Sequence, residues 1–237
     1  MSATAPFCFP VKNLSNTKVK LVPFEVDRHA PRFIELGGGG PEIWAHMLAG
    51  PFDTVDYFKS IFANDVAPGP AVFHYAILDL TKPADESGEE GGAFAGVLSY
   101  TDASPANLSL EIGILVLPPF QRTHVTSNAV GLGVLQALTS KSEGGFGLTR
   151  VLWQTSTANK GSIKVAERMG FRLEGTLKYH RQFKDGKLNG KVGNGRPSPP
   201  GCSENDLWRD TLILSLCWDD WDENAREKVQ AAMDRTR

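Results

Sequence analysis

One charged side chain, Glu111, interrupts an otherwise apolar and β-branched run from Leu110 to Leu117. Burying a carboxylate without a partner costs free energy. Glu111 must therefore pair with a cation, face a water-filled cleft or have a raised pKa. A carboxylate with a raised pKa can take a proton from a substrate near neutral pH. A structural ion pair and a place at an exposed strand end are the alternatives.

A polar segment, Gln121 to Thr126, follows this run closely. It precedes a predicted helix, whose first turn carries backbone N–H groups without intrahelical partners and the positive end of the helix dipole. Several N–H donors are therefore aimed at one point. This is the chemistry of an anion-binding site.

Two elements position these residues. The run from Leu110 to Leu117 is predicted to be a strand covered on both faces. Pro118-Pro119 ends it because proline lacks the N–H that a ladder needs. From about Val125 the apolar period becomes helical, which predicts an amphipathic helix. The residues on its apolar face are Val130, Val134 and Leu138.

The elbow from Gln121 to Thr126 resembles the central motif of the GNAT acyltransferases, Gln/Arg-x-x-Gly-x-Gly/Ala. Gln121 matches the first position, whereas His124 and Thr126 stand where the family has its glycines. A second stretch is more specific. Residues 156–162 and 166–175 are similar to the family signature Asn-x-x-Ser…Ala-Glu-Arg-x-Gly-Phe-x-x-Glu-Gly. In spacing the resemblance covers roughly residues 19–221 and is strong from 109 to 175. The sequence resembles the branch that contains the Rim-type ribosomal-protein N-terminal acetyltransferases and their small-molecule-modifying relatives.

The resemblance implies an α/β GNAT fold, with a mixed and mostly antiparallel sheet flanked by helices, and acetyl-CoA as the cofactor. The elbow would hold the pyrophosphate, a backbone N–H near Val116 the thioester carbonyl, and Asn159 the pantetheine arm. The implied cofactor-binding residues are Leu115, Val116, Gln121, Arg122, Thr123, His124, Val125, Thr126, Asn159 and Ser162. The alternative is that threonines merely cap the elbow and that Asn159 and Ser162 cap the following helix.

Glu111 and Ser162 are the candidate catalytic residues. Relatives commonly have a carboxylate near Glu111 as the base, often acting through water. Many also carry a tyrosine acid four residues before the glycine of the Gly-Phe pair, but here that position is Ala166. Ser162 or a water would then have to protonate the leaving thiolate.

Four further residues lie on the last two predicted strands, which in relatives wall the acceptor side. They are the candidate substrate-binding residues Tyr179, His180, Trp208 and Asp210. Aromatic side chains there could hold an apolar or aryl amine. Packing in the core and at its rim is the alternative.

Composition excludes several classes of function. A net charge of −2 argues against a general electrostatic grip on nucleic acid. No apolar run approaches the ~20 residues of a membrane span, and residues 1–10 have no signal-peptide pattern. Cys8, Cys202 and Cys217 show no metal-binding spacing with one another or with histidine. We expect reduced thiols, no metal and a cytoplasmic protein.

The chain is predicted to contain an extended N-terminal arm at 1–18 and one GNAT domain at 19–237. Short helices are expected at 29–36, 42–48 and 53–62, an acidic hairpin tip at 82–92 and a solvated terminal helix at 222–235. The long glycine- and proline-rich loop at 184–206 carries no packing signal, so it is either mobile or folds over a ligand.

These patterns predict an acetyl-CoA-dependent N-acetyltransferase that moves the acetyl group directly to a primary amine of a small molecule. A protein N-terminus as acceptor and a catalytically silent CoA-binding module are the alternatives. The acceptor is a small-molecule amine or a peptide N-terminus, and the protein is expected to be a monomer or homodimer.

Overall fold

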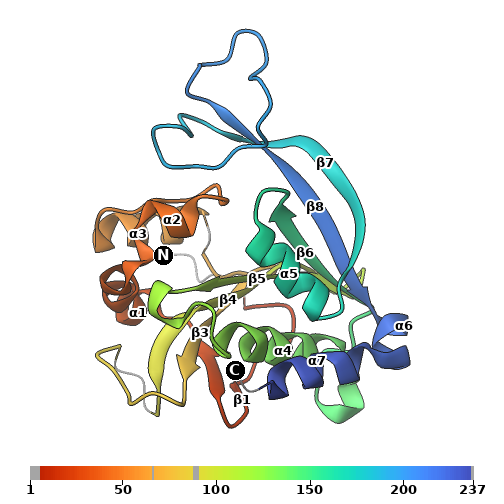
Figure 1. Ribbon diagram of the computed structural model, residues 1–237. Coiled ribbons are helices and arrows are strands. Elements are labelled where there is room, and N and C mark those ends of the chain that lie inside the picture. The colour runs from red at the N-terminus through yellow and green to blue at the C-terminus, as the bar shows by residue number, and fades with distance from the viewer. Residues whose placement is uncertain (1–5, 66, 88–90, 236–237) are drawn as a thin grey trace.

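A mixed sheet of eight strands forms the centre of the molecule (Figure 1). The computed structural model describes residues 6–65, 67–87 and 91–235. The strand order is β1-β2-β3-β4-β5-β6-β8-β7, and only β5 and β6 run parallel. This confirms the predicted mixed, mostly antiparallel sheet. The strands are β1 Leu14–Ser15, β2 Val19–Pro23, β3 Phe73–Asp79, β4 Ala93–Ser104, β5 Ser109–Val116, β6 Arg150–Ser156, β7 Arg172–Phe183 and β8 Leu207–Cys217.

Helices flank the sheet in two groups. Figure 1 shows α1, α2 and α3 together on one side of the view, and α4, α5 and α7 together beside the middle of the sheet. A π-helical turn at Ile34–Gly38 extends α1, and another at Trp221–Ala225 joins α6 to α7. The helices are α1 Val26–Phe33, α2 Pro41–Trp44, α3 Val55–Asp65, α4 Val125–Leu138, α5 Lys160–Arg168, α6 Trp218–Asp220 and α7 Arg226–Asp234.

β5 alternates between a buried and a half-buried face. Leu110 and Ile112 are fully buried, whereas Glu111, Gly113 and Leu115 on the other face are only half-buried. The prediction of a strand covered on both faces is therefore wrong. One face lies in the core, and the other borders the cavity described below.

α4 begins at Val125, as predicted, but it is not amphipathic. Nearly every residue of the helix is buried, because the sheet covers one side and α7 another. Val229 and Met233 of α7 are buried as well, whereas most of its other residues are exposed, so the predicted solvated terminal helix has one face in the core. Gly131 permits this close approach, since a Cβ there would overlap the side chain of Met233.

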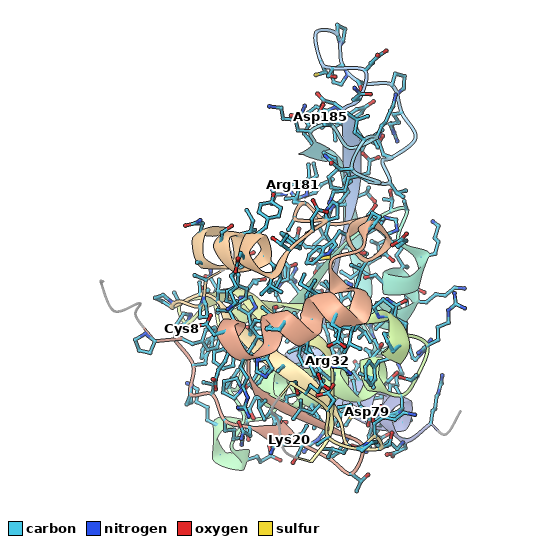
Figure 2. The ribbon with its side chains drawn as sticks, turned by 90° about the vertical axis from the view of Figure 1, so that its left-hand side faces the viewer. Cys8, Lys20, Arg32, Asp79, Arg181 and Asp185 are labelled. Atoms are coloured by element: carbon cyan, nitrogen blue, oxygen red, sulfur yellow. The ribbon has the colours of Figure 1, made fainter. Side chains whose placement is uncertain are left out.

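β7 and β8 extend beyond the sheet as a long arm that carries the loop at 184–206 (Figure 1). Figure 2 shows Asp185 far out on this arm and Arg181 nearer its base, whereas Asp79 and Arg32 lie at the opposite end of the view. The loop returns to the body, where the Val192 N–H donates to the Ala45 carbonyl over 2.7 Å. The loop is thus folded onto the segment after α2, and neither expectation for it, mobility or folding over a ligand, is tested by this contact.

The expected helix at 42–48 is much shorter in the structure, where α2 ends at Trp44. From there on, the carbonyls of Trp44, Met47 and Ala49 accept hydrogen bonds from the Lys191 Nζ on the loop of the arm, and the Trp44 carbonyl also accepts from the Met47 N–H.

The described part of the N-terminal arm packs on the body. Leu14 pairs with Leu21 in the sheet and Phe9 is buried. Residues 1–5 of the predicted arm and residues 88–90 of the predicted hairpin tip lie outside the described residues.

Candidate active site

The two parallel strands separate soon after they meet. β5 and β6 pair only through Ser109 with Arg150, Leu110 with Val151 and Glu111 with Leu152. Each strand then continues without pairing to the other, β5 to Val116 and β6 to Ser156. The backbone N–H and C=O groups on the facing edges of β5 and β6 are therefore available to form hydrogen bonds with a ligand that lies between the strands.

A cavity of about 590 Å³ lies at this separation. Its walls come from four regions besides β5 and β6: the segment around α2, the elbow before α4, the start of α5, and β8. From these regions the lining residues include Glu42, Ile43, His46, Met47, Leu48, Ala49, Gln121, Thr126, Asn159, Ser162, Val165 and Arg209.

Glu111 lines the cavity. Burial raises the pKa of Glu111 to about 7, and the charge of Asp102 acts in the same direction. A hydrogen bond of 2.6 Å from the Gln154 Nε2 opposes this rise, as do the charges of Arg209 and Arg181. Among the described residues no cation forms an ion pair with Glu111, so the structural ion pair is excluded there. A carboxylate with this pKa can gain and release a proton near pH 7.

The second signature forms the N-terminus of α5. Asn159 is its N-cap, and its Oδ1 accepts from the Ser162 N–H over 3.0 Å. Asn159 therefore caps α5, whereas the Ser162 side chain does not, and the cap leaves the amide NH₂ of Asn159 for a ligand. The Ser162 Oγ accepts from the Trp153 Nε1 over 2.9 Å, which leaves the hydroxyl hydrogen free to be donated elsewhere. Ala166, at the position of the family's tyrosine, is fully buried.

The elbow uses some of its N–H groups internally. The Gln121 N–H donates to the Pro118 carbonyl, and the Val125 N–H to the Thr123 Oγ1. These two N–H groups are thus not available to an anion, contrary to prediction. The Thr126 N–H has no acceptor within the described residues, and Thr126 lines the cavity.

A positive φ within the elbow occurs at Arg122, which has φ +61°. His124, at the first glycine position of the family, has φ −66° and ψ −19°, an ordinary helical conformation that needs no glycine. Its imidazole does not line the cavity but points to β3, where Nε2 lies 3.1 Å from the buried carboxylate of Asp79. His124 therefore anchors the elbow to the end of β3.

The predicted cofactor-binding residues separate into two groups. Those that line the cavity are Leu115, Val116, Gln121, Thr126, Asn159 and Ser162, and those that do not are Arg122, Thr123, His124 and Val125. Val125 is fully buried in the core. The outer group can reach a ligand only beyond the cavity mouth, through backbone groups or a long side chain.

The four predicted substrate-binding residues do not line the cavity. Tyr179 and Trp208 pack edge to face, with ring centroids 5.8 Å apart. Asp210 accepts from the Tyr179 N–H and from the Asn194 Nδ2, so it joins the arm to its loop. Side chains alternate along a strand, and the cavity lies on the other face of β8, where Arg209 lines it.

Lys191 is a residue that the sequence pattern did not single out. It is buried, and its Nζ donates to the carbonyls of Trp44, Met47 and Ala49 at 3.1, 2.8 and 2.6 Å. Burial lowers the pKa of Lys191 to about 8, so the ammonium form still predominates at pH 7. We call this set of contacts the Lys191 clamp. It holds the segment 41–49, which forms one wall of the cavity.

A mixed sheet thus opens between its two parallel strands, with a carboxylate and a helix N-terminus at the opening. The chain belongs to the GNAT acetyltransferases, because the model of the family "Acetyltransferase (GNAT) domain" matches residues 18–172. This family uses acetyl-CoA. None of the curated proteins matches the chain. Among the described helices, none is both long and apolar enough to cross a membrane.

Solved structures share the fold along nearly the whole chain. A GCN5-related N-acetyltransferase from Brucella melitensis has a TM-score of 0.72 and 21% identity, covering 98% of this chain and 90% of that one. Mycobacterium smegmatis RimJ in complex with CoA-disulfide has a TM-score of 0.65 and 20% identity, covering 94% and 93%. Spermidine N-acetyltransferase from Vibrio cholerae, in complex with CoA and spermine, has a TM-score of 0.60 and 14% identity, covering 87% and 99%.

Proposed function

We propose that this chain transfers an acetyl group from acetyl-CoA directly to a primary amine of a small molecule, with both held at the separation of β5 and β6. The observation that carries the proposal is the position of Glu111. A carboxylate with a pKa of about 7 lines the same cavity as the elbow before α4 and the N-terminus of α5.

The residues around the cavity suit acetyl-CoA. The N–H groups of Thr123, His124 and Thr126 would hold its diphosphate, supported by the dipole of α4. The open edges of β5 and β6 and the side-chain amide of Asn159 would bind its amide-bearing arm. When bound, acetyl-CoA supplies an acyl group activated as a thioester.

Glu111 would act as the general base. An acceptor amine with a pKa near ~10.4 is mostly protonated at pH 7, and removing that proton costs on the order of 4–5 kcal/mol. Glu111 would take the proton, directly or through a water, while Gln154 fixes the orientation of its carboxylate. Such a positioned base contributes about 10²–10⁴-fold to the rate.

Ser162 would serve the leaving sulfur. Because Trp153 already donates to its Oγ, the hydroxyl hydrogen points away from the indole and can be passed to the thiolate while the Oγ takes up a proton from a solvent water, so that the hydroxyl is restored. The Ser162 hydroxyl would thereby do the work of the family's tyrosine, whose position is occupied by Ala166 in this chain.

The walls of the cavity favour a small-molecule acceptor over a protein N-terminus, because they limit access to it. The segment 41–49 forms one wall, and the Lys191 clamp ties it to the loop of the arm. A large polypeptide acceptor would have to enter past both.

The test combines acetyl-CoA with a panel of amines and follows the release of free thiol, alongside calorimetric titration with CoA. We expect heat on binding and thiol release that depends on the amine. Binding without release for any amine would favour the silent module. The absence of binding heat at millimolar CoA with folded protein would overturn the proposal.

A further inference from the structure

Arg209 places a guanidinium group in the cavity wall near Glu111. Its Nε donates to the Thr211 Oγ1 over 2.9 Å, and its Nη1 to the His46 carbonyl over 3.1 Å. A guanidinium has five N–H donors in a fixed plane. The remaining donors of Arg209 have no acceptor within the described residues, so they are available to a ligand in the cavity.

Besides Glu111, the groups around Arg209 are a second guanidinium and two imidazole nitrogens without hydrogen-bond partners in the described ranges. Arg181 lies directly opposite it in the β7–β8 ladder, and like charges in that position repel each other. In the described part of the chain, neither guanidinium forms an ion pair with a carboxylate. The Nδ1 atoms of His46 and His180 are buried without a hydrogen-bond partner there. His46 lines the cavity beside Arg209.

These guanidinium and imidazole groups cost folding free energy unless a bound ligand pairs with them. Arg209 is half-buried, and the Glu111 carboxylate that attracts it forms no ion pair with it among the described residues. Leaving this guanidinium without an ion-pair partner and a buried imidazole nitrogen unsatisfied both cost free energy. A carboxylate has two oxygens that match a guanidinium fork and can also accept from an imidazole N–H. A neutral carbonyl could accept a hydrogen bond from the guanidinium but would not balance its charge, and a cationic group would add to the repulsion.

We propose that the acceptor amine also carries a carboxylate, which Arg209 and His46 bind while the amine is directed to Glu111. The proposal rests on the proposed function and narrows its substrate class to amino acids and related amino carboxylates. It assigns Arg209 as the residue that selects the acceptor. Polyamines and simple alkylamines are then poor substrates, because they offer Arg209 no anion.

The test compares each amino acid with its own carboxamide, which has the same amine but no negative charge. Steady-state thiol release is measured for the wild type, Arg209→Gln, Arg209→Lys and the control Arg172→Gln. Arg172 is exposed on β7 and pairs with Asp220, so its loss leaves the cavity unchanged. Each acid and amide pair is compared at a pH where the same fraction of each amine is neutral.

We expect the wild type to prefer acids to their amides by about 10- to 100-fold in kcat/KM, the range of a hydrogen bond to a charged group. Arg209→Gln removes this preference by raising KM for the acids far more than for the amides, while the loss of its charge beside Glu111 changes kcat for both to the same extent. Arg209→Lys should keep part of the preference for acids, because lysine retains the positive charge but lacks the planar pair of donors that binds a carboxylate. Unchanged binding heat with CoA and an unchanged thermal unfolding midpoint show that Arg209→Gln is folded.

Equal kcat/KM for acids and amides in the wild type would overturn this inference alone and leave the acetyltransferase intact. A preference for acids that Arg209→Gln retains would also overturn it. No thiol release from any amine would overturn the proposed function and, with it, this inference.

Discussion

The Gln154 Nε2 donates a hydrogen bond of 2.6 Å to the Glu111 Oε2 across the point where β5 and β6 separate. Glu111 pairs with Leu152 in the ladder between β5 and β6. Gln154 lies two residues beyond Leu152, so its side chain is on the same face of β6. The separation of the two strands thus creates the cavity and also supplies the residue that orients its carboxylate.

Replacing Glu111 by glutamine should stabilise the protein at alkaline pH. The carboxyl has a pKa of about 7 in the folded chain against an ordinary value of 4.5, so the unfolded chain loses this proton first. Stability therefore falls as pH rises from about 4.5 to about 7, and the loss is complete above that range. Glu111→Gln removes it, a gain of up to about 3 kcal/mol at pH 8 relative to acidic pH. Urea unfolding of both proteins at pH 5 and pH 8 measures the difference, and a gap that does not change with pH would contradict the assignment.

Two substitutions of Asn159, the N-cap of α5, should separate its contribution to stability from its contribution to CoA binding. Asn159→Ala removes the oxygen that accepts from the Ser162 N–H and should cost about 1 kcal/mol of unfolding free energy. Asn159→Asp keeps a capping oxygen but loses the amide N–H donors. It should therefore retain stability and still bind CoA more weakly. Chemical unfolding and calorimetry on the two variants check this, and full CoA affinity in Asn159→Asp would exclude a role for the amide.

The Lys191 clamp should control the acceptor and not the cofactor. Lys191→Met fills a similar volume but leaves three carbonyls of the segment 41–49 without their donor, so that segment should loosen. We expect KM for the amine to rise several-fold while KM for acetyl-CoA is unchanged. Lys187→Met, on the exposed part of the same loop, is the control. Equal effects on both substrates would show that the clamp supports the whole fold.

Restoring the family's glycine at His124 should harm the protein. His124→Gly deletes a partner of the buried Asp79 carboxylate and frees a backbone that is already helical, so stability should fall by about 1–3 kcal/mol. His124→Ala separates the two effects, because it removes the imidazole without adding glycine's freedom. Thermal unfolding of both variants tests this, and a gain in stability for His124→Gly would contradict the anchoring role.

The sequence predicted the central elements well, because their signals are local. Pro118-Pro119 ends β5, and the change of apolar period places the start of α4 at Val125. The specific signature placed Asn159 at the start of α5, where the structure has it as the N-cap. Prolines, periods and capping residues act over a few positions and can be recognised without knowledge of the fold.

The acceptor side was less predictable, because its contacts are distant along the chain. The choice of Trp208 and Asp210 over Arg209 selected the wrong face of β8, since nothing local reveals which face of a strand meets a cavity. Lys191 binds backbone carbonyls more than 140 residues away, and backbone acceptors leave no mark in the sequence. The burial of α4 on nearly all sides likewise depends on α7, which lies far along the chain.

The pH dependence of kcat/KM for the amine tests the central claim, that Glu111 receives the proton at this cavity, most directly. For the wild type, we expect the slope of log kcat/KM against pH to increase by about one below pH 7, as Glu111 becomes protonated. Glu111→Gln should lose about 10²–10⁴-fold in rate and lack this change of slope, with its affinity for CoA unchanged. A Glu111→Gln enzyme with the wild-type rate and profile would contradict the account.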